Sequence, residues 1–103
     1  MHRFRNWREA IQASQDAECV ATLISEYVAS IRRSDLDGLS QHCRRVLTDP
    51  DTDIQAAAVT LLREELAFDG NAQLGAVLHE IAHTFAAASV RLGQLLGHGP
   101  TPF

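Results

Sequence analysis

The sequence contains no lysine, only two cysteines and no long uninterrupted run of hydrophobic residues. A membrane-spanning helix needs about 18 consecutive apolar residues, so we expect no membrane span. Acidic residues outnumber basic residues 13 to 9, which gives a formal net charge of −4, and nucleic acid is therefore not an expected partner. No apolar stretch follows the basic N-terminal residues as it would in a secretory signal, so we expect a cytoplasmic protein.

The sequence also lacks the patterns of several enzyme classes. It has no convincing Ser/His/Asp arrangement, no glycine-rich phosphate-binding loop and no CxxC pair. Cys19 and Cys43 are expected to be small buried hydrophobic residues rather than partners in a disulfide, because the cytoplasm keeps thiols reduced. These absences favour a protein that is not an enzyme and that needs no cofactor.

The hydrophobic pattern predicts an all-α fold. Apolar residues recur at spacings of three and four, and no segment alternates with the period of two that is typical of a half-buried strand. The 103 residues, of which 46% are hydrophobic, are enough for one domain with a core of its own. We therefore predict a single helical domain, a four-helix bundle with two long and two short helices, with tails at residues 1–6 and 98–103.

The helix boundaries follow from residues that cap helix ends. Asn6, with Glu9 three residues later, forms a capping-box pattern for the first helix. Asp49 before Pro50 is expected to begin the third helix. Gly70 is a candidate left-handed C-terminal cap, and Asn71 can cap the last helix. The expected helices cover residues 7–33, 35–48, 50–68 and 72–96, with a break at Ser34 before the second.

The last predicted helix is unusually poor in charge. Over about 25 residues its only charged side chains are Glu80 and Arg91, although a helix with one solvated face normally carries charges there. We infer that its second face is also covered. Small side chains on that face would allow close approach of another helix, and a second copy of the chain is the expected partner. The predicted homodimer interface consists of Ala82, Ala86, Ser89, Val90 and Gly93.

One segment of this helix carries the pattern HExxH. His79 and His83 are four residues apart, so they share a helix face and both imidazoles can bind one zinc ion. The segment resembles the zinc-binding helix of zinc metallopeptidases, and the resemblance implies that Glu80 acts as general base on a metal-bound water. A catalytic zinc usually takes a third protein ligand, for which the sequence offers His98 or His42. The metal-binding candidates are thus His79, His83 and Glu80.

The same residues allow two further interpretations. Glu80 and His83 form an ExxH element that resembles those of ferritin-like di-metal bundles, which bind iron or manganese. A dimer would have to supply the second element, with additional glutamates turned inward. The candidates for these glutamates are Glu18, Glu26, Glu64 and Glu65.

Residues 82–93 resemble the phospho-accepting helix of histidine phosphotransfer domains. The resemblance places His83 at the phosphorylated position, with Phe85, Leu92 and Gly93 in step with the family pattern. It implies a phosphorelay-like module. The family's lysine and glycine are replaced here by Ala86 and Ala87.

No site in the sequence is complete, and our leading interpretation is a small non-catalytic interaction or regulatory protein that acts as a homodimer. Its partners would be other proteins, bound through the alanine-rich face of the last helix or through the arginine-rich N-terminus. A metal-binding protein that uses zinc, and a degenerate phosphotransfer-like module, are the alternatives.

Overall fold

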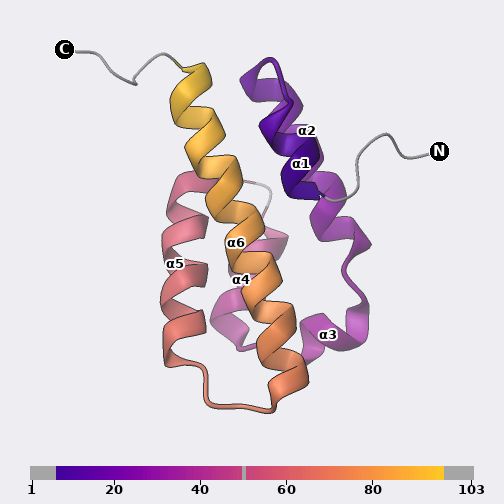
Figure 1. The fold of residues 1–103 in the computed structure, drawn as a ribbon. Coiled ribbons are helices and arrows are strands. Elements are labelled where there is room, and N and C mark those ends of the chain that lie inside the picture. The colour runs from indigo at the N-terminus through magenta and orange to yellow at the C-terminus, as the bar shows by residue number, and fades with distance from the viewer. Residues whose placement is uncertain (1–6, 50, 97–103) are drawn as a thin grey trace.

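A computed structural model describes residues 7–49 and 51–96, and these residues form six helices and no strand (Figure 1). The predicted all-α class is confirmed. Two of the four predicted helices are each divided in two, so the described residues contain more and shorter helices than expected. The helices are α1 (Trp7–Gln12), α2 (Ala17–Ser30), α3 (Arg33–Gly38), α4 (Gln41–Thr48), α5 (Ile54–Ala67) and α6 (Ala72–Leu95).

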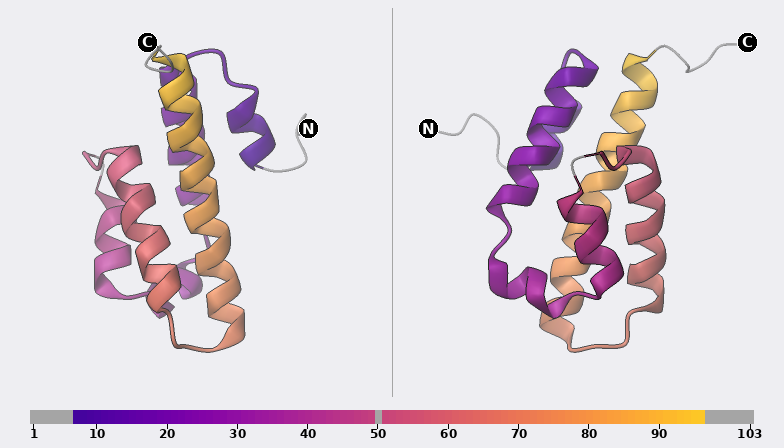
Figure 2. Two further views of the ribbon diagram at one scale, coloured as in Figure 1. Left: turned by 60° about the vertical axis from the view of Figure 1, so that its left-hand side comes forward. Right: turned by 180° about the vertical axis from the view of Figure 1, so that it is seen from behind.

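Helix α6 is the central element of the fold. It packs most extensively against α5 on one side, and it also packs against α1 and α2 (Figures 1 and 2). Its inward face contributes side chains to the hydrophobic core together with residues of α1, α2, α4 and α5. The buried residues of α6 are Leu78, Ile81, Ala82, Thr84, Phe85 and Ala88.

This arrangement explains why α6 carries so few charges. Both flanks of the helix are covered within a single chain, so the second covered face that the sequence indicates does not require a second copy. Ala82 is fully buried in the core of one chain and is not available to a partner. Val90, by contrast, is 63% exposed, and Ala86, Ser89 and Gly93 are partly exposed. The homodimer stays a prediction.

The first predicted helix, 7–33, is interrupted after Gln12. Asp16 begins α2 with an extended backbone, and its carboxylate accepts a hydrogen bond from the Cys19 amide at 2.7 Å. The carbonyl of Ser14, in the interruption, accepts bonds from Nε and Nη2 of Arg91 at 3.0 and 2.7 Å. The break is therefore fixed by a local cap and by a contact with α6.

The second predicted helix, 35–48, is also divided. Ser40 separates α3 from α4, and its hydroxyl accepts a hydrogen bond from the Cys43 amide at 3.1 Å. Helix α3 begins at Arg33, so Ser34, which was expected to break the first helix, lies inside a helix. The cap at Ser40 therefore begins a new helix at a point where the hydrophobic pattern predicts one continuous helix.

The ends of α5 differ from the prediction, whereas the start of α6 matches it. Asp53, rather than Asp49, caps α5, because its carboxylate accepts a hydrogen bond from the Ala56 amide at 3.0 Å. Helix α5 ends with Phe68 in an extended conformation, and Gly70 does not adopt the predicted left-handed conformation. Asn71 caps α6 as predicted, with its side chain 2.8 Å from the Leu74 amide.

The remaining expectations concern the tails and the cysteines. The tails at 1–6 and 98–103, the cap at Asn6 and the proline at Pro50 lie outside the described residues. Cys19 and Cys43 are free thiols. Cys43 is buried as expected, whereas Cys19 is exposed, so its expected burial is wrong. Among the residues that the structure describes, no helix has the length and hydrophobicity to cross a membrane.

Candidate metal centre

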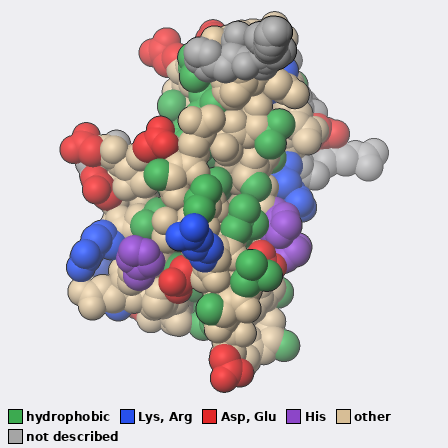
Figure 3. Space-filling model, turned by 90° about the vertical axis from the view of Figure 1, so that its left-hand side faces the viewer, with side chains coloured by type: hydrophobic (Ala, Val, Ile, Leu, Met, Phe, Trp, Pro, Cys, Tyr) green, Lys and Arg blue, Asp and Glu red, His purple; other side chains and the backbone are tan. Residues whose placement is uncertain are grey.

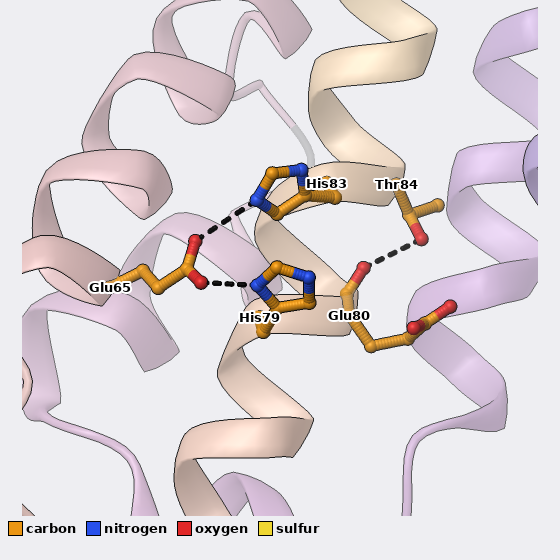
Figure 4. A network of polar contacts seen from close by, with 5 residues as sticks. All are labelled: Glu65, His79, Glu80, His83 and Thr84. Carbon is orange, nitrogen blue, oxygen red and sulfur yellow. Dashed lines mark hydrogen bonds and ion pairs between the residues drawn. The ribbon is translucent and has the colours of Figure 1, made fainter.

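His79 and His83 lie one turn apart on the face of α6 that borders α5. Their ring centroids are 4.1 Å apart, and the ring planes are tilted by 33° (Figure 4). Helical spacing places these two imidazoles beside the buried residues Leu78 and Ala82, at the edge of the packed interface rather than inside it. The two histidines are therefore held by a helix whose own position the core fixes.

Glu65 on α5 completes the group. Leu61, one turn earlier on α5, is fully buried, so the helical repeat places Glu65 at the edge of the same interface. Its carboxylate extends toward both imidazoles (Figure 4). Oε2 of Glu65 contacts Nδ1 of His79, and Oε1 lies 3.2 Å from Nε2 of His83.

These three residues form a cluster of potential metal ligands, which we call the EHH site: Glu65, His79 and His83. One ligand atom from each lies within 4.8 Å of the other two. The side chains are partly open to solvent, with exposed fractions of 24% for Glu65, 55% for His79 and 39% for His83. Histidine side chains reach the surface on the side of the molecule where α5 lies (Figure 3). The EHH site is thus accessible to an ion from solution.

The electrostatics keep Glu65 in the form that binds cations. The hydrogen bond to His79 lowers the pKa of the Glu65 carboxyl below its ordinary value. Partial desolvation opposes this effect, while the charges of His79 and His83 in their protonated forms, and the bond to His83, lower the pKa further. Glu65 is therefore ionised at neutral pH and offers a negatively charged oxygen ligand.

Glu80, the acidic residue of the HExxH pattern, is not part of the EHH site. Its side chain points away from Glu65, toward the other side of α6 (Figure 4). There, Oε2 of Glu80 lies 3.5 Å from Nη2 of Arg8 on α1. The backbone carbonyl of Glu80 accepts a hydrogen bond from the buried Thr84 hydroxyl at 2.7 Å. The third potential ligand thus comes from another helix rather than from the motif.

The other predicted ligands are not brought to the EHH site. His42 is exposed on α4 and is not part of the cluster, and His98 lies outside the described residues. Of the glutamates considered for a di-metal site, only Glu65 joins the histidines. Glu64 instead accepts hydrogen bonds from the Ser40 hydroxyl at 3.1 Å and the Cys43 thiol at 3.6 Å. Glu18 and Glu26 are exposed on α2.

Comparison of the chain with known proteins identifies no relative. No family model, curated protein or solved structure matches the chain. The chemistry of the EHH site must therefore be argued from its own residues.

The arrangement offers three potential ligands to a cation. Two imidazole nitrogens and one carboxylate oxygen match the ligands that zinc takes in proteins. Without an ion, the same carboxylate bridges the two rings and links α5 to α6. The Nε2 atom of His83 faces Glu65, so a phosphoryl group on that nitrogen would meet a carboxylate. The EHH site therefore suits a cation better than a phosphoryl group.

Proposed function

We propose that the protein binds a zinc ion at the EHH site. The observation that carries the proposal is the meeting of two imidazoles from α6 and a carboxylate from α5 within 4.8 Å. Zinc binds imidazole nitrogen at about 2.0–2.1 Å and carboxylate oxygen at about 2.0–2.2 Å in tetrahedral geometry. Tetrahedral ligands at these lengths are about 3.3 Å apart, and Oε1 of Glu65 already lies 3.2 Å from Nε2 of His83.

Zinc at the EHH site would connect two helices. His79 and His83 belong to α6, and Glu65 belongs to α5. Glu65 and His79 are in contact although they are 14 residues apart in the sequence. Because the unfolded chain does not hold these residues together, zinc binding stabilises the folded state. A helix pair joined by metal fits the regulatory, non-catalytic role that the sequence favours.

Two features distinguish this proposal from peptide hydrolysis. Glu80, the residue that would act as general base by resemblance to metallopeptidases, is paired with Arg8 on the far side of α6. The described residues also contain no strand along which an extended peptide could pair. Three protein ligands leave one position of a tetrahedral zinc open to water. The proposed function is nevertheless the binding of the ion and not catalysis.

The test is a calorimetric titration of the metal-free full chain with zinc at neutral pH. We expect one equivalent to bind. Glu65→Gln keeps the size of the side chain but removes its charge, and it should weaken binding by about tenfold or more, or about 1.4 kcal/mol.

Glu80→Gln is the matched control, since it changes the glutamate of the HExxH pattern outside the EHH site. Its zinc affinity should equal that of the wild type. Equal affinity of wild type and Glu65→Gln, or loss of binding in Glu80→Gln alone, would refute the EHH site.

A further inference from the structure

A groove runs between α1 and α6, next to the EHH site. One wall is formed by Arg8 and Gln12 of α1, and the floor is the α6 face that runs from His83 to Gln94. Its volume is about 470 Å³, which lies within the range of about 300–1,000 Å³ that is typical of small-molecule sites. We call it the α1–α6 groove.

The α1–α6 groove is positively charged on a chain that is acidic overall. None of its lining residues is a carboxylate, although the sequence has 13 acidic residues. Within residues 7–49 and 51–96, the guanidinium of Arg91 bonds only neutral groups, the Ser14 carbonyl and Oε1 of Gln94 at 3.0 Å. Arg8 pairs with Glu80 at 3.5 Å, and both side chains are about half exposed, at 41% and 51%. The charge of Arg91 therefore faces no carboxylate among the described residues.

The middle of the floor is apolar and formed by small side chains. Ala86 and Ala87 are partly exposed there, and Val90 is 63% exposed. An exposed valine in a groove that two arginines also line offers a ligand an apolar contact as well as a cationic one. Hydrocarbon placed on this floor would remove apolar surface from water, which contributes about 25 cal/mol per Å².

We propose that the α1–α6 groove binds a small organic carboxylate. Its carboxylate would lie beside Arg8 and would accept hydrogen bonds from the second N–H groups of Nη1 and Nη2 of Arg91, since the first ones bond Gln94 and Ser14. Its hydrocarbon part would lie on Ala86, Ala87 and Val90. The groove shares His83 with the EHH site, but neither Glu65 nor His79 lines it, so a change at Glu65 can separate the two proposals.

The experiment is a nuclear magnetic resonance titration of the isotope-labelled full chain, in the presence of a chelator, with sodium benzoate as the probe. We expect saturable shifts of the backbone amides of Ala86, Ala87 and Val90. Benzyl alcohol, which has the ring without the charge, should bind about tenfold more weakly. Inorganic phosphate, which has charge without hydrocarbon, should also bind more weakly. Equal binding of benzyl alcohol or of phosphate would contradict the proposal, as would the absence of saturable shifts.

A pair of variants locates the site. Val90→Glu places a carboxylate on the exposed floor, where it repels the probe without disturbing the core, and it should weaken benzoate binding by about tenfold or more. Val59→Glu makes the same change at a half-exposed position of α5 outside the groove, and it should bind benzoate as the wild type does. Equal loss in both variants would show that net charge, rather than the groove, governs binding.

Glu65→Gln separates this proposal from zinc binding. The variant should bind benzoate with wild-type affinity, because Glu65 does not line the groove. If benzoate binds only to zinc-loaded protein and not to Glu65→Gln, the carboxylate sits on the metal and the groove proposal is wrong.

Discussion

Replacing Arg91 with methionine should destabilise the fold at the junction of α1, α2 and α6. Nε and Nη2 of Arg91 donate two hydrogen bonds to the Ser14 carbonyl, and Ser14 is 3% exposed. Methionine keeps the apolar stem but leaves that carbonyl without these donors. Hydrogen bonds from a charged donor contribute about 1.5–3 kcal/mol, and we expect a loss of that size in the free energy of unfolding.

Thermal unfolding followed by circular dichroism measures this loss. In a domain of about 100 residues, 1 kcal/mol changes the Tm by about 4–8 °C, so a loss of about 1.5–3 kcal/mol in Arg91→Met should lower the Tm by about 6–24 °C. Arg63→Met is the matched control, because Arg63 is exposed on α5, and it should change stability by less than about 0.5 kcal/mol. Equal Tm values for the two variants would refute the argument that Arg91 fixes the break between α1 and α2.

Three further predictions concern pH, thiols and the predicted dimer. The pKa of Glu65 is lowered below 4.5, so its ionised contact with the histidines stabilises the fold above that pH and is lost as the pH falls through the lowered pKa. The stability difference between metal-free wild type and Glu65→Gln in denaturant titrations should therefore shrink below pH 4.5, whereas a constant difference would contradict this assignment. Exposed Cys19 should react with a thiol reagent about tenfold or more faster than Cys43, because Cys43 is buried and burial raises the pKa of its thiol. Equal rates would show that the thiol of Cys43 is not shielded from the reagent. Gly93 has open space around it, so Gly93→Ala should stabilise α6 by about 0.5–1 kcal/mol in the same titrations; if Gly93 lies in a tight homodimer interface, the variant will instead weaken self-association in light scattering.

The sequence predicts the central helix well because several signals agree there. The apolar spacing of three and four and the Asn71 cap indicate a long helix, and the low number of charges indicates that both of its flanks are covered. Helix α6 is long, is capped by Asn71 and packs against α5 on one side and α1 and α2 on another. The identity of the covering elements could not be predicted. The pattern gives the same expectation whether α5 and α1 or a second copy covers the helix.

The breaks in the predicted helices were missed for a different reason. The apolar pattern continues through Ala13 and Ala17, so periodicity gives no sign of the end of α1. The available signal was Asp16, a strong N-cap residue, but such residues also occur inside helices. The bond of Arg91 to Ser14 joins segments 77 residues apart, and no local pattern encodes it.

The EHH site shows the same limit of sequence patterns. The spacing of His79 and His83 correctly predicts that the two imidazoles share a face. The same pattern also predicts Glu80 as a metal-binding residue, but the side chain of Glu80 pairs with Arg8 of α1 instead. Glu65 follows the buried Leu61 by one turn, and this spacing was the signal that could have placed it at the edge of α6.

X-ray absorption at the zinc edge of the zinc-loaded full chain tests the proposed zinc centre most directly. We predict four nitrogen or oxygen ligands at about 2.0–2.2 Å, with the multiple scattering of two imidazoles. Glu65→Gln should change the oxygen contribution, since Glu65 supplies the carboxylate. A shell of oxygen alone without imidazole scattering, or sulfur at about 2.3 Å from a cysteine, would contradict a zinc centre built from Glu65, His79 and His83.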